Sequence, residues 1–261
     1  KYCDHLPLYR QSQIYARAGI DLERSTMADW VGECAGLMES LVGAIERHVM
    51  AGQKIHADDT PMPVLQPGRG KTKTGRLWTY VRDDRPAAGP APPAVWFQYS
   101  PDRRQEHPAR HLSAFTGILQ ADAYAGFDPL YEKRKDKPAL TEAGCWAHVR
   151  RKFYDLHKAT GSPAALEALQ RIGDLYEVEE LVRGQPPPVR TEMRQANAKT
   201  LLDDLHKWLL ETLAKTTAKG ELAKAIRDGF VKEPAVAQVR RLARETEFTT
   251  AHTAFEQQAA Q

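Results

Sequence analysis

The feature that most constrains the fold is an ordered run of strand and helix signals between residues 51 and 160. Short segments rich in aromatic and β-branched residues, several of them with period-two alternation, predict strands. These strands are Lys54–Asp58, Leu77–Arg82, Ala94–Tyr99, Gly117–Ala121 and Leu140–Cys145. Helical signals cover His107–Phe115, before the fourth strand, and Trp146–Lys158, after the fifth. Because the first three strands follow one another through loops, we expect them to form an antiparallel meander.

This order predicts an α/β fold, a ribonuclease-H-like mixed sheet with flanking helices. We expect a helix-turn-helix-like hairpin over residues 1–50, the ribonuclease-H-like core over 51–160 and a helical insertion over 161–227. Residues 228–261 have weak periodicity and a polar end, so we expect an atypical, poorly ordered tail. The sequence leaves open whether the hairpin binds DNA or is scaffolding.

Composition narrows the class of protein. The chain has 261 residues, of which 42% are hydrophobic and 27% charged, as in an ordinary soluble domain. Its three cysteines have no regular spacing, which argues against a disulfide framework and favours a reducing cytosol. The sequence contains no apolar run of membrane-spanning length and no signal peptide. Because the chain begins with Lys1 rather than Met, we expect it to be a piece of a longer protein.

Two aspartates stand at the ends of predicted strands. Asp58 ends the first strand, and Asp122 follows the fourth. In the expected topology these strands are neighbours, so both carboxylates would meet at one edge of the sheet. Two-metal phosphodiester cleavage uses carboxylates that hold divalent ions about 3.5–4 Å apart, and Mg²⁺ prefers oxygen ligands. The residues alone leave open whether these aspartates bind metal or simply cap strands and form turns.

Several blocks of the chain resemble the insertion sequence 66 family of DDE transposases. The blocks are Lys1–Arg10, Ser25–Trp30, Ile55–Pro61, Leu119–Phe127 and Cys145–Phe153, and the resemblance extends to about Arg227. It implies a bacterial, cytoplasmic and nucleoid-associated enzyme that cuts DNA at element ends. The freed 3′-hydroxyl would then attack target DNA. The resemblance also implies Mg²⁺ or Mn²⁺ as cofactor, double-stranded DNA as partner, self-association on that DNA, and no membrane.

The resemblance assigns roles to individual residues. Asp58 and Asp122 become the catalytic acids and metal ligands. Asp59 stands where the family usually has Glu, so we interpret it as a neighbour that supports the ligands. His148 is expected either to orient a phosphate or water, or to be structural. Cys145 and His148 have a zinc-like spacing, but no second ligand pair accompanies them, so we reject a zinc site.

The chain departs from the family at the third acid. The family's Glu, which lies beyond the helical insertion, has no counterpart in the expected context. The acids of the tail that lack this context are Glu233, Glu245, Glu247 and Glu256. The alternative to an active transposase is therefore a catalytically inactive, truncated remnant that retains only DNA binding. A cellular ribonuclease-H-like nuclease is disfavoured because the matching blocks point to the transposase family.

The net charge of +3 permits a nucleic-acid partner without requiring one. Basic residues are expected to contact DNA phosphates at two places. The first group is Arg69, Lys71 and Lys73 in the predicted loop Pro67–Gly75, with Arg76 directly after it, and the second is Arg150, Arg151 and Lys152. A solvated loop is the alternative for the first group. We expect a second cluster to be a solvated face: Lys133, Arg134, Lys135 and Lys137. Five aromatic residues are expected in the sheet core rather than in a base-stacking platform: Trp78, Tyr80, Trp96, Phe97 and Tyr99.

Overall fold

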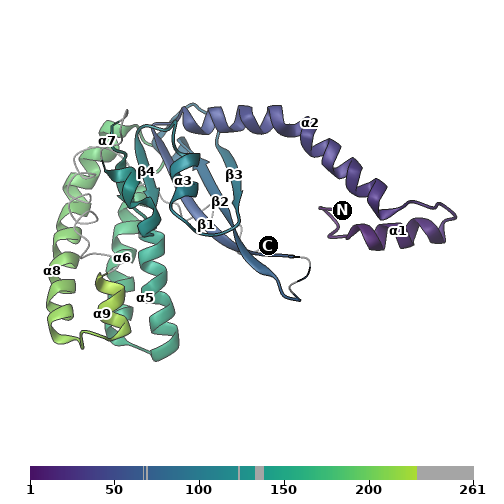
Figure 1. Ribbon diagram of the computed structural model, residues 1–261. Helices are drawn as coiled ribbons and strands as arrows, with labels where there is room; N and C mark the ends of the chain where they lie inside the picture. Colours follow the sequence, from purple (N-terminus) through teal and green to yellow (C-terminus); the bar gives the residue numbers. More distant parts are fainter. Residues whose placement is uncertain (67, 69, 123, 133–137, 228–261) are drawn as a thin grey trace. The chain divides into compact units, whose positions relative to one another are not determined.

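The computed structural model describes residues 1–66, 68, 70–122, 124–132 and 138–227 (Figure 1). The basic cluster at 133–137, the tail from residue 228 and Arg69 lie outside these described residues. The chain divides into two compact units, Lys1–His48 and Val49–Gln261. None of the helices in the described ranges combines the length and apolar composition that crossing a membrane requires.

The first unit contains the two predicted helices, α1 (Leu8–Arg17) and most of α2 (Arg24–Met50). Gly19 follows the end of α1 with a φ of 80°, a conformation that glycine adopts without steric cost, and the helix ends there. An apolar stripe runs along α2, but much of it is exposed rather than buried. Its exposed large members are Trp30, Leu37 and Leu41.

The second unit is built on a five-stranded mixed sheet with the order β3-β2-β1-β4-β5 (Figure 1). The strands are β1 Lys54–Val64, β2 Lys73–Arg82, β3 Ala94–Ser100, β4 Ile118–Ala121 and β5 Thr141–Gly144. The first three form the predicted antiparallel meander, and β4 pairs in parallel with both β1 and β5. The mixed α/β fold expected from the sequence is therefore confirmed.

The hairpin of β1 and β2 is longer than predicted. Pairing continues as far as Val64 with Lys73, so the prediction of a loop over Pro67–Gly75 is wrong from Lys73 onward. The first strand was predicted to end at Asp58, before Pro61 and Pro63. Among the described residues, however, β1 pairs with β4 only over its first three residues, from Lys54 to His56. Beyond that point β1 needs a hydrogen-bonded neighbour on one side alone, and an edge strand tolerates proline.

One face of the sheet carries an aromatic core. Trp78, Tyr80 and Trp96 are buried, as predicted, and pack around His111 of α3 (Glu106–His111). Two hydrogen bonds join polar side-chain atoms inside this core. The Trp78 indole donates to Ser100 Oγ at 2.7 Å, and the Tyr80 hydroxyl lies 3.0 Å from His111 Nδ1. This core holds the helical connection between β3 and β4 against the sheet.

Strand alternation corrects the prediction for two aromatic residues. Phe97 and Tyr99 are neighbours of Trp96 in β3 but point to the opposite face, where both are exposed. They are therefore not part of the sheet core.

Short helices follow the strands: η1 is Arg85–Ala87, η2 is Ala125–Phe127 and α4 is Asp128–Tyr131.

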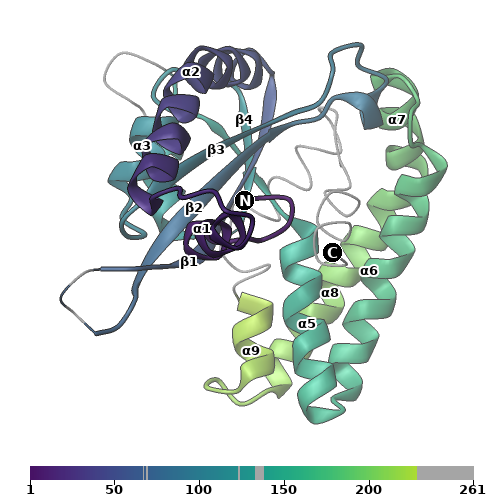
Figure 2. The same cartoon turned by 90° about the vertical axis from the view of Figure 1, so that its right-hand side faces the viewer.

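The carboxyl-terminal part of the described chain is helical (Figure 2). Its helices are α5 Trp146–Thr160, α6 Pro163–Leu181, α7 Pro187–Met193, α8 Lys199–Lys215 and α9 Glu221–Ile226, with a π-helical turn over Arg194–Ala198. Helices α6 to α9 fill the range predicted as a helical insertion, and the side chain of Ser162 caps α6 by accepting a hydrogen bond from the amide of Ala165. Phe153 of α5 is buried in one apolar cluster with Ile172 of α6 and Leu205 of α8.

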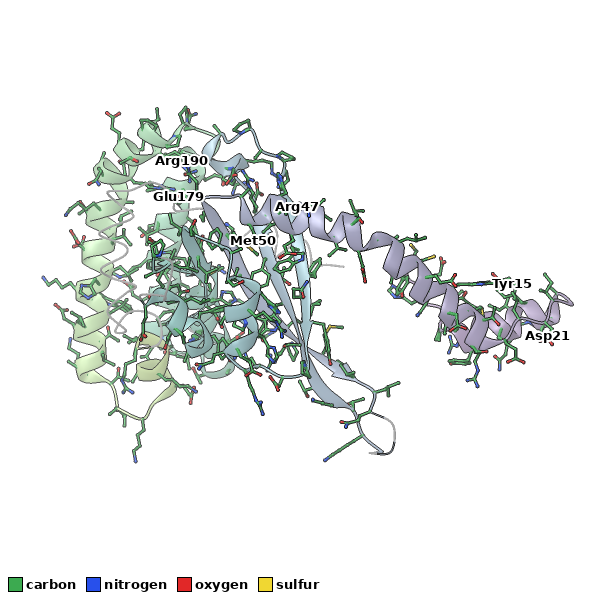
Figure 3. The ribbon with its side chains drawn as sticks, turned by 45° about the horizontal axis from the view of Figure 1, so that its top comes forward. Tyr15, Asp21, Arg47, Met50, Glu179 and Arg190 are labelled. Carbon is green, nitrogen blue, oxygen red and sulfur yellow. The ribbon has the colours of Figure 1, made fainter. Side chains whose placement is uncertain are left out.

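A buried ion cluster ties these helices to the sheet (Figure 3). Glu179 of α6 accepts two hydrogen bonds from Arg194, at 2.6 and 2.8 Å, and lies 3.4 Å from Arg190. Arg190 also donates to the carbonyl of Pro86, in the connection between β2 and β3, at 2.6 Å. The cluster therefore joins α6, α7 and the sheet through charged groups that water does not reach.

We predict that stability falls as the pH drops from about 6.5 toward 4. Burial lowers the pKa of His111 to about 4, and burial together with Lys54 lowers the pKa of His56 to about 3. The unfolded chain protonates both near pH 6.5, so in this window it binds more protons than the folded chain. Urea denaturation at pH 7 and pH 5 measures the loss. His111→Gln should reduce the difference, and an unchanged difference would contradict the role of His111.

We also predict that Glu179→Gln lowers the free energy of unfolding by about 3–5 kcal/mol, because it leaves two buried arginines without their carboxylate. Glu180→Gln is the matched control. Glu180 is an exposed neighbour that forms a surface pair with Arg183, so its loss should cost less than about 1 kcal/mol. Urea denaturation measures the free energy of unfolding of both variants. Equal losses would show that the buried cluster contributes no more to stability than the surface pair does.

Candidate active site

The parallel pairing of β1 with β4 brings Asp58 and Asp122 to the same level of the sheet. The register pairs Lys54 with Ile118 and His56 with Gln120. Extending it by two residues places Asp58 beside Asp122, which directly follows the last residue of β4. Asp58 does not end β1, as the sequence had suggested, since it is still paired with Thr79 of β2. It lies instead just past the point where β1 and β4 separate.

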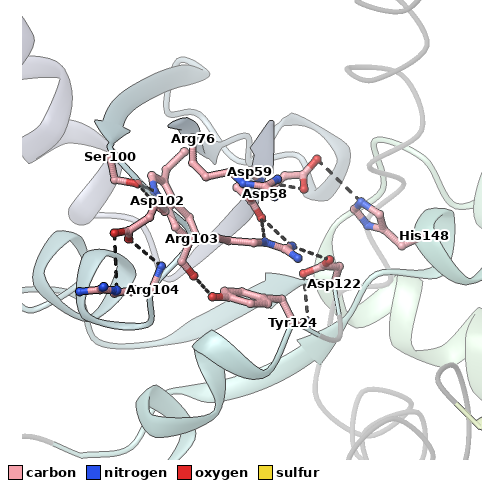
Figure 4. A network of polar contacts seen from close by, with 11 residues as sticks. Asp58, Asp59, Arg76, Ser100, Asp102, Arg103, Arg104, Asp122, Tyr124 and His148 are labelled. Carbon is pink, nitrogen blue, oxygen red and sulfur yellow. Dashed lines mark hydrogen bonds and ion pairs between the residues drawn. The ribbon is translucent and has the colours of Figure 1, made fainter. Parts of the chain in front are cut away.

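Both of these carboxylates reach solvent (Figure 4). The side chains of Asp58 and Asp122 are 26% and 27% exposed. Each holds its orientation through one local hydrogen bond: the amide of Asp59 donates to Asp58 Oδ1 at 2.8 Å, and the amide of Tyr124 donates to Asp122 Oδ1 at 3.2 Å. The second oxygen of each carboxylate points into the polar network between the strands and α5.

Asp59 has a different environment from Asp58. Its side chain is 1% exposed, and each of its oxygens faces an arginine. Arg76 lies 3.0 Å from Oδ2, while Arg103 donates to Oδ1 through Nε at 2.9 Å. Strand alternation explains the contrast, because Asp59 lies opposite Trp78 on the aromatic face and Asp58 points to the other face. Asp59 is thus held as a buried ion-pair partner.

Arg103 was not singled out by the sequence, yet it lies at the centre of the network. Its Nη2 is 2.7 Å from Asp59 Oδ1 and 3.5 Å from Asp122 Oδ2, so the guanidinium bridges the two acids. It also stacks over the ring of Tyr124 at 3.9 Å. The arginine is 44 residues from Asp59 in the chain. No local pattern in a sequence reports such a distant ion pair.

His148 reaches the site from the first turn of α5. Its Nε2 lies 3.7 Å from Asp58 Oδ2. Burial alone would lower the pKa of His148, but its interactions with Asp58 and Cys145 outweigh burial and raise the pKa to about 10. At 3.7 Å from Asp58 Oδ2, a protonated imidazole would partly neutralise Asp58.

The structure separates the basic residues that the sequence had grouped. Lys71 and Lys73 lie at the far end of the β1–β2 hairpin, whereas Arg76 is turned inward onto Asp59. On α5, Arg151 forms a surface pair with Asp155 at 3.9 Å. Its neighbours Arg150 and Lys152 share this first half of the helix, within four residues of His148. Phosphate binding by these side chains stays a prediction.

Residues 1–244 match the family described as "Transposase IS66 family", which covers most of the chain. The chain belongs to this family. The resemblance noted in the sequence is therefore confirmed.

This IS66-family chain is similar to curated proteins that are longer than the chain itself. It is 39% identical over 239 residues to "Uncharacterized protein y4qI" of Sinorhizobium fredii (strain NBRC 101917 / NGR234), covering 90% of this chain and 44% of the relative. It is 42% identical over 238 residues to "Uncharacterized protein y4hP" of the same strain, covering 87% of this chain and 43% of the relative. The chain thus spans less than half the length of these relatives.

The donor set at this edge suits a hard divalent cation. Asp58 and Asp122 offer solvent-accessible carboxylate oxygens, the ligands that Mg²⁺ and Mn²⁺ prefer, and water can complete the coordination of Mg²⁺. Within the described ranges there is no cluster of three or more His, Cys, Asp and Glu side chains that could hold a metal ion.

We predict that Asp59 and Asp58 differ in their contribution to stability. Asp59→Asn should cost about 2 kcal/mol, because it removes charge-assisted hydrogen bonds from a buried carboxylate. Asp58→Asn should cost less than about 1 kcal/mol, because Asp58 is partly exposed and its contact with His148 is 3.7 Å long. Thermal and urea denaturation of the two variants test this pair. A larger loss for Asp58→Asn would reverse our assignment of the structural and the accessible carboxylate.

Proposed function

We propose that this chain is the central catalytic region of a DNA transposase, with a ribonuclease-H-like core that cuts DNA and transfers strands with Mg²⁺ or Mn²⁺. The observation that carries the proposal is the β1–β4 register, which aligns Asp58 with Asp122 at a solvent-accessible edge. Family membership supports the same reading. The strand order, a meander followed by two parallel strands, is what the ribonuclease-H-like expectation requires of the core.

In this proposal Asp58 and Asp122 would hold the metal, and the chemistry that it would supply there is activation of water and stabilisation of charge on the phosphate. Asp59 keeps the end of β1 in place through its two arginines. His148 supports Asp58 and offers a positive charge beside the scissile phosphate. Cleavage leaves a 3′-hydroxyl that attacks target DNA, so the chemistry requires no serine or tyrosine nucleophile.

The proposed DNA contacts lie on two elements. Lys71 and Lys73 sit on the β1–β2 hairpin, and Arg69 belongs to its predicted basic loop. The first half of α5 supplies the basic side chains of Arg150, Arg151 and Lys152. The proposal includes the domain division at residues 1–50, 51–160, 161–227 and 228–261, self-association on DNA and a bacterial cytoplasmic, nucleoid-associated location.

A second candidate is an inactive remnant that binds DNA without cutting it. The observation in its favour is that the described residues supply no cluster of three metal-ligating side chains. The two candidates share the fold and the DNA contacts, so only a measurement of DNA cleavage separates them.

The decisive experiment is nicking of supercoiled plasmid by this chain with Mg²⁺ or Mn²⁺. Asp58→Asn and Asp122→Asn should each reduce the rate by about 100-fold or more, because loss of a metal ligand removes several kcal/mol of transition-state stabilisation. Asp203→Asn, on the surface of α8, is the control and should leave the rate unchanged.

Each outcome has a definite meaning. Nicking that chelator abolishes and that both site variants lack supports the catalytic proposal. A folded parent that binds DNA but does not nick it favours the inactive remnant. Nicking that survives both site substitutions removes Asp58 and Asp122 from the active site.

A further inference from the structure

The guanidinium of Arg103 occupies the space between two acids of the site (Figure 4). It makes its shorter contacts with Asp59, from Nε at 2.9 Å and Nη2 at 2.7 Å. The same Nη2 lies 3.5 Å from Asp122 Oδ2, a distance of ionic attraction rather than a hydrogen bond. Arg103 therefore pairs mainly with Asp59 and has a weaker ionic contact with Asp122.

The position of Arg103 is built by its surroundings. Tyr124 lies under the guanidinium at 3.9 Å, and its hydroxyl donates to the Arg103 carbonyl. Gly126 makes room for this ring, because a Cβ at that position would collide with Tyr124. The adjacent Arg104 offers a contrast: its side chain is 73% exposed and reaches Asp102 only at 3.5 Å. Of these two neighbouring arginines, Arg103 is the one that the fold holds in place.

The charges around Arg103 differ between its two partners. Asp59 has a second cation, Arg76, so it stays neutralised whatever Arg103 does at Asp122. Asp122 is more than a quarter exposed and is one of the two proposed metal ligands. A divalent ion at Asp122 would therefore meet a positive charge already in place, and like charges at such distances oppose one another.

We propose that Arg103 is a resident counter-cation of the acid site, which a divalent metal ion must displace from Asp122. In the metal-free protein it screens Asp122, and when metal binds, the guanidinium withdraws onto Asp59 and the Tyr124 ring. Arg103 thereby sets the metal concentration at which the site fills. This role rests on the proposed function only in taking Asp58 and Asp122 as the metal ligands.

The test is Mn²⁺ binding by the DNA-free chain, measured by calorimetry and by the electron paramagnetic resonance signal of free Mn²⁺. Arg103→Gln should bind Mn²⁺ about tenfold more tightly, the lower end of the effect of one opposite charge on a carboxylate equilibrium. Arg103→Lys keeps the charge and should stay within about threefold of the parent, because its ammonium still opposes the metal ion. Arg104→Gln, next to it in the same loop, is the matched control and should not change the Kd.

A double variant locates the effect. In the Asp122→Asn background, Arg103→Gln should no longer tighten binding, because its action passes through that carboxylate. Circular dichroism establishes that each variant is folded, and Arg103→Met serves as a second uncharged variant if the glutamine form does not fold.

The outcomes separate this inference from the proposed function. If Asp122→Asn weakens Mn²⁺ binding but Arg103→Gln leaves it unchanged or weaker, Arg103 is not a counter-cation and the proposed site stands. If Asp122→Asn leaves Mn²⁺ binding unaffected, the proposed ligand and the role of Arg103 both fail. If neither the parent nor Arg103→Gln binds Mn²⁺ measurably, the proposed role of Arg103 is also contradicted.

Discussion

The short parallel pairing between β1 and β4 is the constraint on which the candidate site depends. Only three residue pairs join the two strands in the described register, yet these fix which residues of β1 and β4 stand side by side. A slip of one residue would turn Asp58 to the opposite face from Asp122. Parallel neighbours also need a long crossover, and here β2, β3 and α3 provide it. The aromatic core around His111 therefore serves the site indirectly, because it seats that crossover against the sheet.

Two consecutive aspartates acquire different chemistry from strand alternation. Asp58 points to the face of α5 and stays accessible, whereas Asp59 points to the aromatic face and is buried between two arginines. Burying a carboxylate is costly unless its charge is paired, so Arg76 and Arg103 are a requirement of the position of Asp59. The same arginines bring positive charge to the edge where Asp122 lies. One ion-pair network thus neutralises Asp59 and places a positive charge beside Asp122.

The sequence predicted what depends on local pattern. It predicted the order of strands and helices and the two aspartates that the register brings together. It missed the length of the β1–β2 hairpin, because prolines normally exclude a strand and only the short pairing with β4, in the described residues, shows that the end of β1 has a neighbour on one side alone. It placed Phe97 and Tyr99 in the core, because hydrophobicity alone does not report which face of β3 is covered. It missed Arg103, since an ion pair across 44 residues has no sequence signature.

The helical part contributes to the site through α5. His148 and the basic residues Arg150 and Arg151 all lie on the first turns of this helix, while Phe153, near its middle, is buried against α6 and α8. The orientation of α5 is therefore set by the helical cluster, and that cluster is tied to the β2–β3 connection through Arg190 and Pro86. The angle at which His148 meets Asp58 consequently depends on contacts far along the chain. A helical segment that resembles an insertion in the sequence thus acts as a support for one side of the acid site.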